Sequence, residues 1–323
     1  NPMHYRRLGR SGLKVSEISL GSWVTFGNQV DGQNSIDIVR AAYDQGVNFF
    51  DTADMYAGGQ AEVVIGKAIK GLPREALVLS SKVFWPTMPG PNGRGLSRKH
   101  ILESIHATLR RMDTDYLDLY YCHRYDPDTS FEEVVRVMDD LVHQGKVTYW
   151  GTSEWEASQV TQAFGTARQF NLVPPITEQP QYNLFHRKRV ENDLMPVTRE
   201  LGMGLTTWSP LYYGILTGKY NTGIPEGSRA SLPEMGWIRD HITPERISAV
   251  RQLSNLAESL DLTTAQLSIA WILRRKEVSS VITGATTMEQ LDENLGAGDA
   301  QERLTEELVD EIFRIISPVA EQQ

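Results

Sequence analysis

Short apolar runs alternate along the chain with amphipathic stretches, and this alternation predicts repeated strand–helix units. Each run is almost continuously apolar, which is typical of parallel strands whose two faces are both covered. We expect eight strands, at residues 18–23, 48–52, 77–83, 116–123, 147–153, 177–181, 204–208 and 280–283. Most of their starts lie about 30 residues apart, the length of one strand–helix unit.

The stretches between the runs carry the helix pattern, with apolar positions three or four residues apart. Clear examples cover residues 97–112, 131–143 and 157–169, and Ser97 is the expected N-cap of the first. Eight such units without a linker or a break in composition predict an α/β fold. We expect a closed (β/α)8 TIM barrel rather than an open doubly wound sheet.

Three further segments are predicted to be loops or turns. Residues 4–15 fit a short N-terminal β-hairpin across the barrel floor, and the Pro- and Gly-rich residues 85–95 fit a long loop after the third strand. Residues 212–244 are too many for a tight connection. We therefore expect this segment to run over the barrel mouth, at the carboxyl ends of the strands.

The length of 323 residues fits one barrel domain spanning 1–323. We interpret Asn1 and Pro2 as a remnant of cloning ahead of a natural start at Met3. Hydrophobic residues make up 40% and charged residues 23% of the chain, so a sizeable core is expected. No apolar run is long enough to span a bilayer and no secretory signal pattern is found, so we expect a cytoplasmic protein.

Charge and cysteine content exclude several classes of protein. The net charge of −9 argues against nucleic acid or an anionic membrane as a partner, since both bind large basic faces. Cys122 is the single cysteine, which excludes a disulfide framework, and we interpret it as an inert core residue. Only one of the seven histidines ends a predicted strand, so no metal site is predicted. Residues 151–155 lack the second glycine of a nucleophile elbow, which argues against a serine hydrolase.

Polar and ionisable residues gather where the predicted strands end, and this end of a (β/α)8 barrel carries the active site. The strand-end residues are Trp23, Asp51, Lys82, His123, Ser153, Gln179, Ser209 and Gly284. Taken singly, Asp51 is explained as a turn residue, Lys82 as half of a buried salt bridge, and His123 as a hydrogen-bonded core group. Their expected convergence on one cavity favours a catalytic site.

Tyr56, five residues after Asp51, is the candidate proton donor. Its ordinary pKa of about 10 is high for proton transfer at neutral pH, and we expect the Lys82 ammonium to lower that pKa. Asp51 would hold Lys82, and at about 4 Å the pair would gain roughly 4 kcal/mol before desolvation is subtracted. His123 would hold a carbonyl oxygen beside Tyr56. No residue here is a nucleophile, so the remaining chemistry must come from elsewhere.

Asp51, Tyr56, Lys82 and His123, at these places on eight strand–helix units, resemble the catalytic tetrad of the aldo-keto reductases. The chain is more similar still to the branch that contains the β subunits of Shaker-type voltage-gated potassium channels and their bacterial and plant homologues. The resemblance runs from about Met3 to Gly298 and is carried by segments 23–27, 95–100, 149–153, 207–210 and 278–281.

The resemblance implies NADPH as hydride donor, bound across the barrel mouth without a Gly-x-Gly-x-x-Gly loop, which this sequence lacks. It implies that Ser153 and Gln179 hold the nicotinamide amide and that Trp208 lies against the ring. Lys219 and Arg229 would bind a 2′-phosphate, because two cations suit a phosphate and not a ribose hydroxyl; the alternative is a pair of solvated loop charges. The other implied cofactor residues are Ser22, Trp23, Gln29, Asp51, His123, Glu154, Ser209, Pro210, Leu211, Gly214, Gly284, Thr286, Gln290, Glu293 and Asn294.

The resemblance thus implies an NADP-dependent aldo-keto reductase that reduces aldehydes or ketones to alcohols, with Tyr56 as general acid. An apolar substrate pocket would be walled by Trp23, Phe84, Trp85 and Tyr56. The alternative is a redox-sensing, NADPH-binding accessory β subunit of a potassium channel, with slow or no turnover. A tetramer is implied by family analogy, whereas the physiological substrate and a channel partner do not follow from the sequence.

Some residues differ from the animal channel subunits that the chain resembles. Those proteins carry Asn where this chain has His123, and we interpret the histidine as favouring carbonyl turnover. Glu154 replaces an arginine that touches the cofactor, Tyr212 and Tyr213 replace Ala and Cys, and Gly227 replaces a Tyr.

Overall fold

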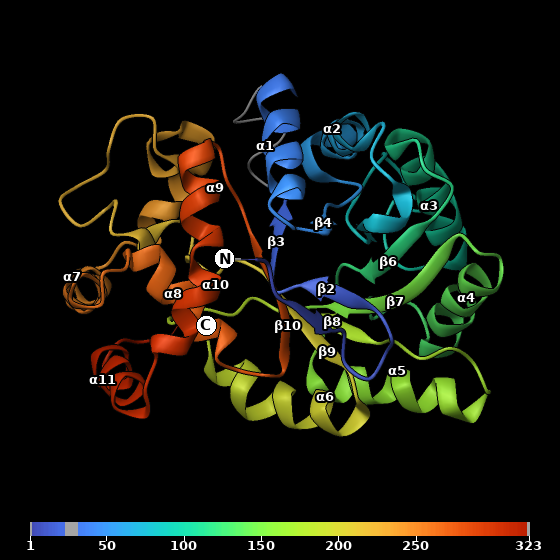
Figure 1. The fold of residues 1–323 in the computed structure, drawn as a ribbon. Coiled ribbons are helices and arrows are strands. Elements are labelled where there is room, and N and C mark those ends of the chain that lie inside the picture. Colours follow the sequence, from blue (N-terminus) through green and yellow to red (C-terminus); the bar gives the residue numbers. More distant parts are fainter. Residues whose placement is uncertain (1, 23–31, 322–323) are drawn as a thin grey trace.

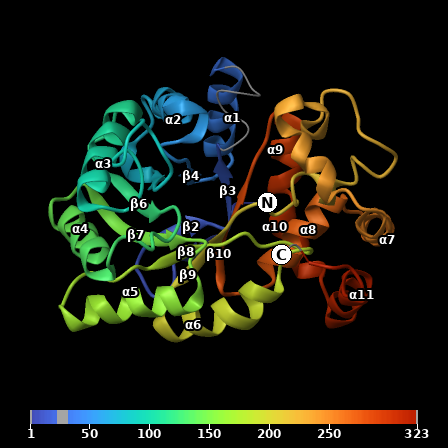
Figure 2. The same ribbon diagram turned by 180° about the vertical axis from the view of Figure 1, so that it is seen from behind.

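The computed structural model describes residues 2–22 and 32–321. Eight parallel strands close into a barrel in the order β10-β3-β4-β5-β6-β7-β8-β9, with helices around it (Figures 1 and 2). The strands are β3 (Ile18–Gly21), β4 (Phe49–Asp51), β5 (Val78–Val83), β6 (Leu117–Cys122), β7 (Val147–Ser153), β8 (Thr177–Gln179), β9 (Gly204–Thr207) and β10 (Val278–Thr283). Each overlaps one of the predicted strands, so the (β/α)8 prediction is confirmed.

The surrounding helices are α1 (Gly32–Asp44), α2 (Gln60–Ile69), α3 (Arg98–Met112), α4 (Phe131–His143), α5 (Ala157–Gln169), α6 (Met195–Leu201), α7 (Pro244–Ser259), α8 (Thr264–Leu273), α9 (Met288–Leu295), α10 (Ala297–Ala300) and α11 (Glu306–Ile316). The bounds of α4 and α5 are those predicted from apolar spacing. Ser97 caps α3 as expected, because its hydroxyl oxygen accepts a hydrogen bond from the His100 backbone N–H at 3.0 Å.

The barrel floor is closed by an antiparallel hairpin of β1 (Tyr5–Arg7) and β2 (Lys14–Ser16), as predicted. Leu8 and Val15 of this segment are fully buried in a core cluster with barrel residues such as Phe49 and Tyr121. The approach is tight: Gly9 has φ +54°, and a Cβ on it would lie 2.3 Å from the Gly202 carbonyl oxygen. With the floor filled, the opposite end of the barrel is where a ligand can enter.

Two long segments lie at that mouth. Residues 85–95 contain no helix or strand, as predicted. Residues 212–244, part of the gold segment in Figure 1, fold into the short helices η4 (Ile215–Thr217), η5 (Arg229–Ser231) and η6 (Pro233–His241). Several of their residues line the mouth cavity described below, so the prediction of an excursion over the mouth is confirmed.

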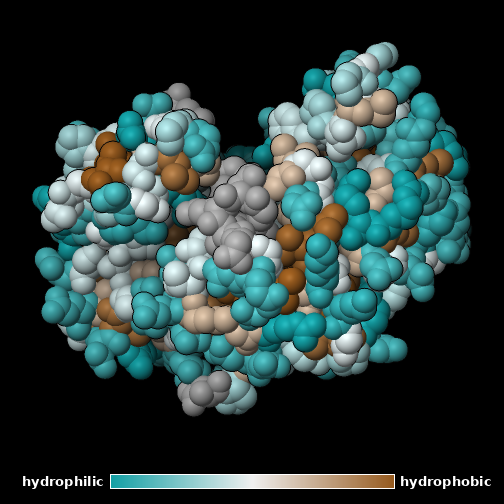
Figure 3. Space-filling view, turned by 90° about the horizontal axis from the view of Figure 1, so that it is seen from above, coloured by the Kyte–Doolittle hydropathy of each residue, from teal (hydrophilic) through white to brown (hydrophobic). Residues whose placement is uncertain are grey.

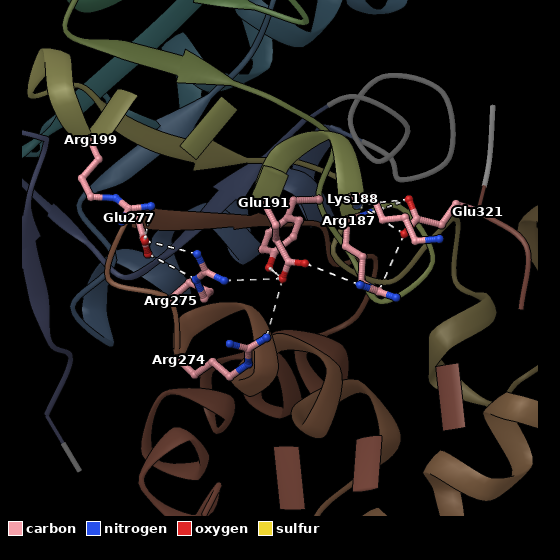
Figure 4. A network of polar contacts seen from close by, with 9 residues as sticks. Arg187, Lys188, Glu191, Arg199, Arg274, Arg275, Glu277 and Glu321 are labelled. Carbon is pink, nitrogen blue, oxygen red and sulfur yellow. Dashed lines mark hydrogen bonds and ion pairs between the residues drawn. The ribbon is translucent and has the colours of Figure 1, made fainter. Parts of the chain in front are cut away.

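An ion-pair network connects the π-helix η3 (Arg189–Leu194) to the segment before β10 and to the chain's C-terminal residues (Figure 4). The Glu191 carboxylate lies 3.6 Å from the Arg187 guanidinium and 3.7 Å from those of Arg274 and Arg275. Arg187 in turn lies 3.7 Å from Glu321. Glu191 thus joins its own segment to Arg274 and Arg275, and Arg187 extends the network to Glu321.

The face of the molecule shown in Figure 3 is mainly hydrophilic. In the face shown in Figure 3, apolar residues form separate small patches rather than one continuous surface. Within the described part of the chain, no helix has both the length and the apolar character that crossing a bilayer requires.

Candidate active site

A buried ion pair joins two neighbouring strands at the barrel mouth. Asp51 ends β4 in register with Ser80 of β5, which brings Lys82 beside it. The Lys82 Nζ donates to Asp51 Oδ2 at 2.6 Å and to the Thr52 carbonyl oxygen at 2.8 Å, and Ser80 Oγ donates to Asp51 Oδ1 at 2.5 Å. Lys82 is fully buried and Asp51 is 3% exposed. Burial alone would lower the pKa of Lys82, but the Asp51 carboxylate and Tyr56 outweigh it, so the pKa is raised and the ammonium stays protonated.

Tyr56 begins the short helix η1 (Tyr56–Gly59) and lies beside this pair. The Lys82 Nζ is 5.1 Å from the centre of the Tyr56 ring, and its positive charge favours the phenolate form of Tyr56. The net pKa of Tyr56 is nevertheless raised, because burial of the phenolate outweighs the opposing effect of Lys82. The expectation of a lowered pKa was therefore wrong in sign. Lys82 offsets part of the burial cost of the phenolate, but not all of it.

His123 follows β6 and faces Tyr56 across the mouth. Their ring centres are 5.8 Å apart at an interplanar angle of 78°, and the backbone N–H of His123 donates to the Val83 carbonyl oxygen at 2.9 Å. Burial, reinforced by the charges of Lys82 and Arg124, holds the pKa of His123 well below its usual range. The imidazole is therefore neutral near pH 7 and can offer one N–H donor to a carbonyl oxygen.

Asp51, Tyr56 and His123 line a cavity of about 960 Å³ that extends from the barrel mouth under residues 212–244. Lys82 lies behind Asp51 and is not part of the lining. Trp23 and Gln29 lie outside the described residues. The cavity brings together the other implied cofactor residues with one exception; they are Ser22, Ser153, Gln179, Trp208, Ser209, Pro210, Leu211, Gly214, Lys219, Arg229, Gly284, Thr286, Gln290, Glu293 and Asn294.

The exception is Glu154, which does not line the cavity. Its Oε1 accepts hydrogen bonds from the Gln181 backbone N–H at 2.6 Å and from Trp208 Nε1 at 3.0 Å, and its Oε2 lies 3.7 Å from the Arg189 guanidinium. The backbone of Glu154 has φ +56°, which directs the side chain into these contacts. Its role in this structure is to hold the Trp208 indole, which does line the cavity.

The substrate end of the cavity differs in detail from the prediction. Trp85 and Tyr56 line it, whereas Phe84 is buried behind Trp85 with their ring centres 4.9 Å apart. Arg124 also lines the cavity and was not predicted from the sequence. The signal that could have identified it is its position directly after His123, at the end of β6.

Two cations lie together at the far end of the cavity. A Cβ on Gly214, whose φ is +88°, would lie 3.2 Å from Arg229 Nη2 and 3.4 Å from Lys219 Nζ. Burial lowers the pKa of both cations, and Arg229 lowers that of Lys219 further. Across residues 2–22 and 32–321 neither forms an ion pair with a carboxylate. Two adjacent, partly buried cations without a carboxylate partner among the described residues fit an anionic group such as a phosphate.

Comparison with known proteins agrees with this geometry. Residues 17–317 match the model described as "Aldo/keto reductase family". The chain is 48% identical over 318 residues to an Arabidopsis thaliana protein named "Probable voltage-gated potassium channel subunit beta", covering 97% of both chains. A protein of the same name from Oryza sativa subsp. japonica is 47% identical over 318 residues, again covering 97% of both. The chain therefore belongs to the aldo/keto reductase family, and plant proteins named as potassium-channel β subunits are among its relatives.

Proposed function

We propose that this protein reduces aldehydes or ketones to alcohols with NADPH as the reductant. The observation that carries the proposal is that one cavity has a candidate proton donor at one end and two cations at the other. Tyr56 and His123 supply the first, and Lys219 and Arg229 the second. Neither cation forms an ion pair with a described carboxylate. A cavity of about 960 Å³ is large enough for an extended dinucleotide and a small carbonyl compound together.

Bound NADPH would supply a hydride to the carbonyl carbon. The residues that would hold it are those lining the cavity, with Ser153, Gln179 and Trp208 at the nicotinamide end and Lys219 and Arg229 at the 2′-phosphate.

The proton chemistry belongs to the chain itself. His123 would donate a hydrogen bond to the carbonyl oxygen and Tyr56 would deliver a proton to it, a contribution worth about 10² to 10⁴ in rate. The Lys82 ammonium, held by Asp51, would stabilise the phenolate that remains until Tyr56 regains a proton from water. Because the pKa of Tyr56 is raised, the hydroxyl form that donates the proton is the resting form at neutral pH.

The Tyr56→Phe variant tests this mechanism. Aldehyde-dependent NADPH oxidation should fall by about 10² to 10⁴, while NADPH binding, followed by quenching of its fluorescence or of protein fluorescence, should persist. Tyr43→Phe, on α1 and outside the cavity lining, is the matched control. Unchanged turnover in Tyr56→Phe would refute the role of Tyr56.

The preference for NADPH over NADH is tested by a double variant in which Lys219 and Arg229 are both replaced by methionine. The Michaelis constant for NADPH should rise far more than that for NADH, since only NADPH carries the 2′-phosphate. Equal effects on the two cofactors would refute the phosphate assignment.

A second candidate function follows from the names of the plant relatives, which describe potassium-channel β subunits. In that case the chain would bind NADPH, turn over slowly and report its redox state to a channel, as one subunit of a tetramer. Steady-state rates with simple aldehydes, light scattering for the tetramer and co-purification with a channel would distinguish the two. Rapid turnover favours the reductase, for which the neutral His123 is suited.

A further inference from the structure

Arg124 places a cation beside the catalytic residues, at the end of the cavity away from Lys219 and Arg229. It follows His123 directly and lines the cavity. Its Nη1 donates to the His123 carbonyl oxygen at 2.6 Å, and its guanidinium carbon lies 5.6 Å from the centre of the Trp85 ring. These two contacts hold the half-buried guanidinium in place.

The charge of Arg124 is not compensated. Across the described ranges, 2–22 and 32–321, no carboxylate lies within ion-pair distance of it. Asp51 is bonded to Lys82. Glu178 interacts with Arg124 electrostatically but forms no ion pair with it, and burial raises the pKa of Glu178 well above its usual range. Among the described residues, Arg124 is therefore a cation with one hydrogen bond, to a backbone carbonyl, and no carboxylate within ion-pair distance.

The position of Arg124 also separates it from the cofactor phosphates. Lys219 and Arg229 lie in the segment that follows β9, whereas Arg124 follows β6, three strands away around the barrel. Arg124 packs on the Trp85 ring, whose centre is 6.4 Å from that of His123, and the ring centres of His123 and Tyr56 are 5.8 Å apart. Arg124 thus lies near the two groups that would hold the carbonyl oxygen. A ligand group that contacts Arg124 would therefore lie beside Tyr56 and His123, where the carbonyl compound is proposed to bind.

We propose that Arg124 binds an anionic group of the substrate, so that the enzyme prefers aldehydes or ketones that also carry a carboxylate or a phosphate. This inference rests on the proposed function. A guanidinium presents a planar set of N–H donors that matches a carboxylate or phosphate oxygen pair. The anionic group takes no part in the reaction: hydride and proton add across the carbonyl group and the anion leaves unchanged on the alcohol.

Matched substrate pairs test the proposal on the full chain. The pairs are 4-carboxybenzaldehyde with benzaldehyde for a carboxylate, and glycolaldehyde phosphate with glycolaldehyde for a phosphate. The unmodified protein should have the higher kcat/KM for the anionic member of at least one pair, and which pair shows it identifies the anion. Arg124→Met should lower that kcat/KM by about 10- to 100-fold, the loss expected for one hydrogen-bonded charged contact. The loss for the neutral member should be much smaller.

Two controls separate binding from structure. Arg94→Met removes an exposed arginine from the neighbouring loop, outside the cavity lining, and should leave the preference for the anionic member intact. Arg124→Lys keeps the charge without the planar donors and should recover part of the loss. An equal fall for both members of each pair would overturn the proposal, since it would mean that Arg124 only supports the His123 backbone.

If no member of either pair is reduced, that outcome refutes the proposed function, but the anion site at Arg124 can still be tested. Calorimetric titration with benzoate and with benzamide then measures the anion site without turnover. Tighter binding of benzoate that is lost in Arg124→Met would support the site. Equal affinities for the two ligands, or benzoate binding that survives Arg124→Met, would overturn it.

Discussion

Asp54 is a buried carboxyl group in the turn that precedes Tyr56, and Asp54→Asn is expected to stabilise the protein more at pH 8 than at pH 5. Asp54 is 2% exposed and lies two residues before Tyr56. Its Oδ2 accepts a hydrogen bond from Ser104 Oγ at 2.7 Å, whereas its Oδ1 is buried without a partner among the described residues. Burial raises the pKa of Asp54 to about 7; Ser104 opposes that effect and the nearby Glu62 adds to it.

The magnitude follows from the two pKa values. The group titrates at about 7 in the folded protein and at about 3.8 in the unfolded chain, so the folded state holds a proton between these values that the unfolded state has lost. Stability from this group therefore falls as the pH rises from about 4 to about 7, and levels off above it. The linkage relation gives a cost of about 2 kcal/mol at pH 5 and about 4 kcal/mol at pH 8.

Asparagine cannot ionise but still offers an acceptor to Ser104, so it removes this cost. Urea unfolding should show that the gain in free energy of unfolding from Asp54→Asn is about 2 to 3 kcal/mol larger at pH 8 than at pH 5. Asp310→Asn, an exposed carboxylate on α11, is the control and should show no such difference. Equal effects of Asp54→Asn at the two pH values would refute the reasoning, since Asp54 would then be ionised at both.

Two further substitutions test the buried charges around the barrel. Lys82→Met should destabilise the protein by about 3 to 5 kcal/mol, because it leaves the Asp51 carboxylate buried without a counter-ion; urea unfolding measures this, and adding Asp51→Asn should recover part of the loss, whereas additive losses would contradict the pairing. Glu178→Gln should change the free energy of unfolding at pH 7 by less than about 1 kcal/mol, because the buried acid is already neutral and Gln is similar in shape; a loss of several kcal/mol would mean that the carboxylate is ionised.

The fold and the tetrad were predictable because they depend on patterns local to each strand. A parallel barrel brings all its carboxyl ends to one mouth, so Asp51, Lys82 and His123 could be placed together from their positions at strand ends alone. Asp54 could not be recognised in this way and reads as an ordinary turn residue. Its burial is created by Ser104 on α3 and by Glu62 on α2, which approach it only in the folded chain.

Glu154 is a second residue whose surroundings could not be predicted from the sequence. The resemblance implied a cofactor contact at this position, but whether a side chain points into a cavity depends on backbone geometry. With φ +56°, Glu154 turns toward the Trp208 indole and the Gln181 N–H instead. A residue's position at the end of a strand predicts that it lies at the barrel mouth. The direction of its side chain can be known only from the structure.

For Tyr56, the sequence predicted which cation acts on the pKa but not whether that cation or burial of the phenolate has the larger effect. The neighbouring cation, Lys82, could be named from the sequence, but the opposing cost of burying a phenolate has no sequence signal. The sign matters for the mechanism: a tyrosine with a lowered pKa would be partly ionised and suited to accept a proton, whereas one with a raised pKa rests as the donor. The raised pKa indicates that Tyr56 rests as the hydroxyl, the form that can donate a proton, while the Lys82 ammonium offsets part of the cost of burying the phenolate.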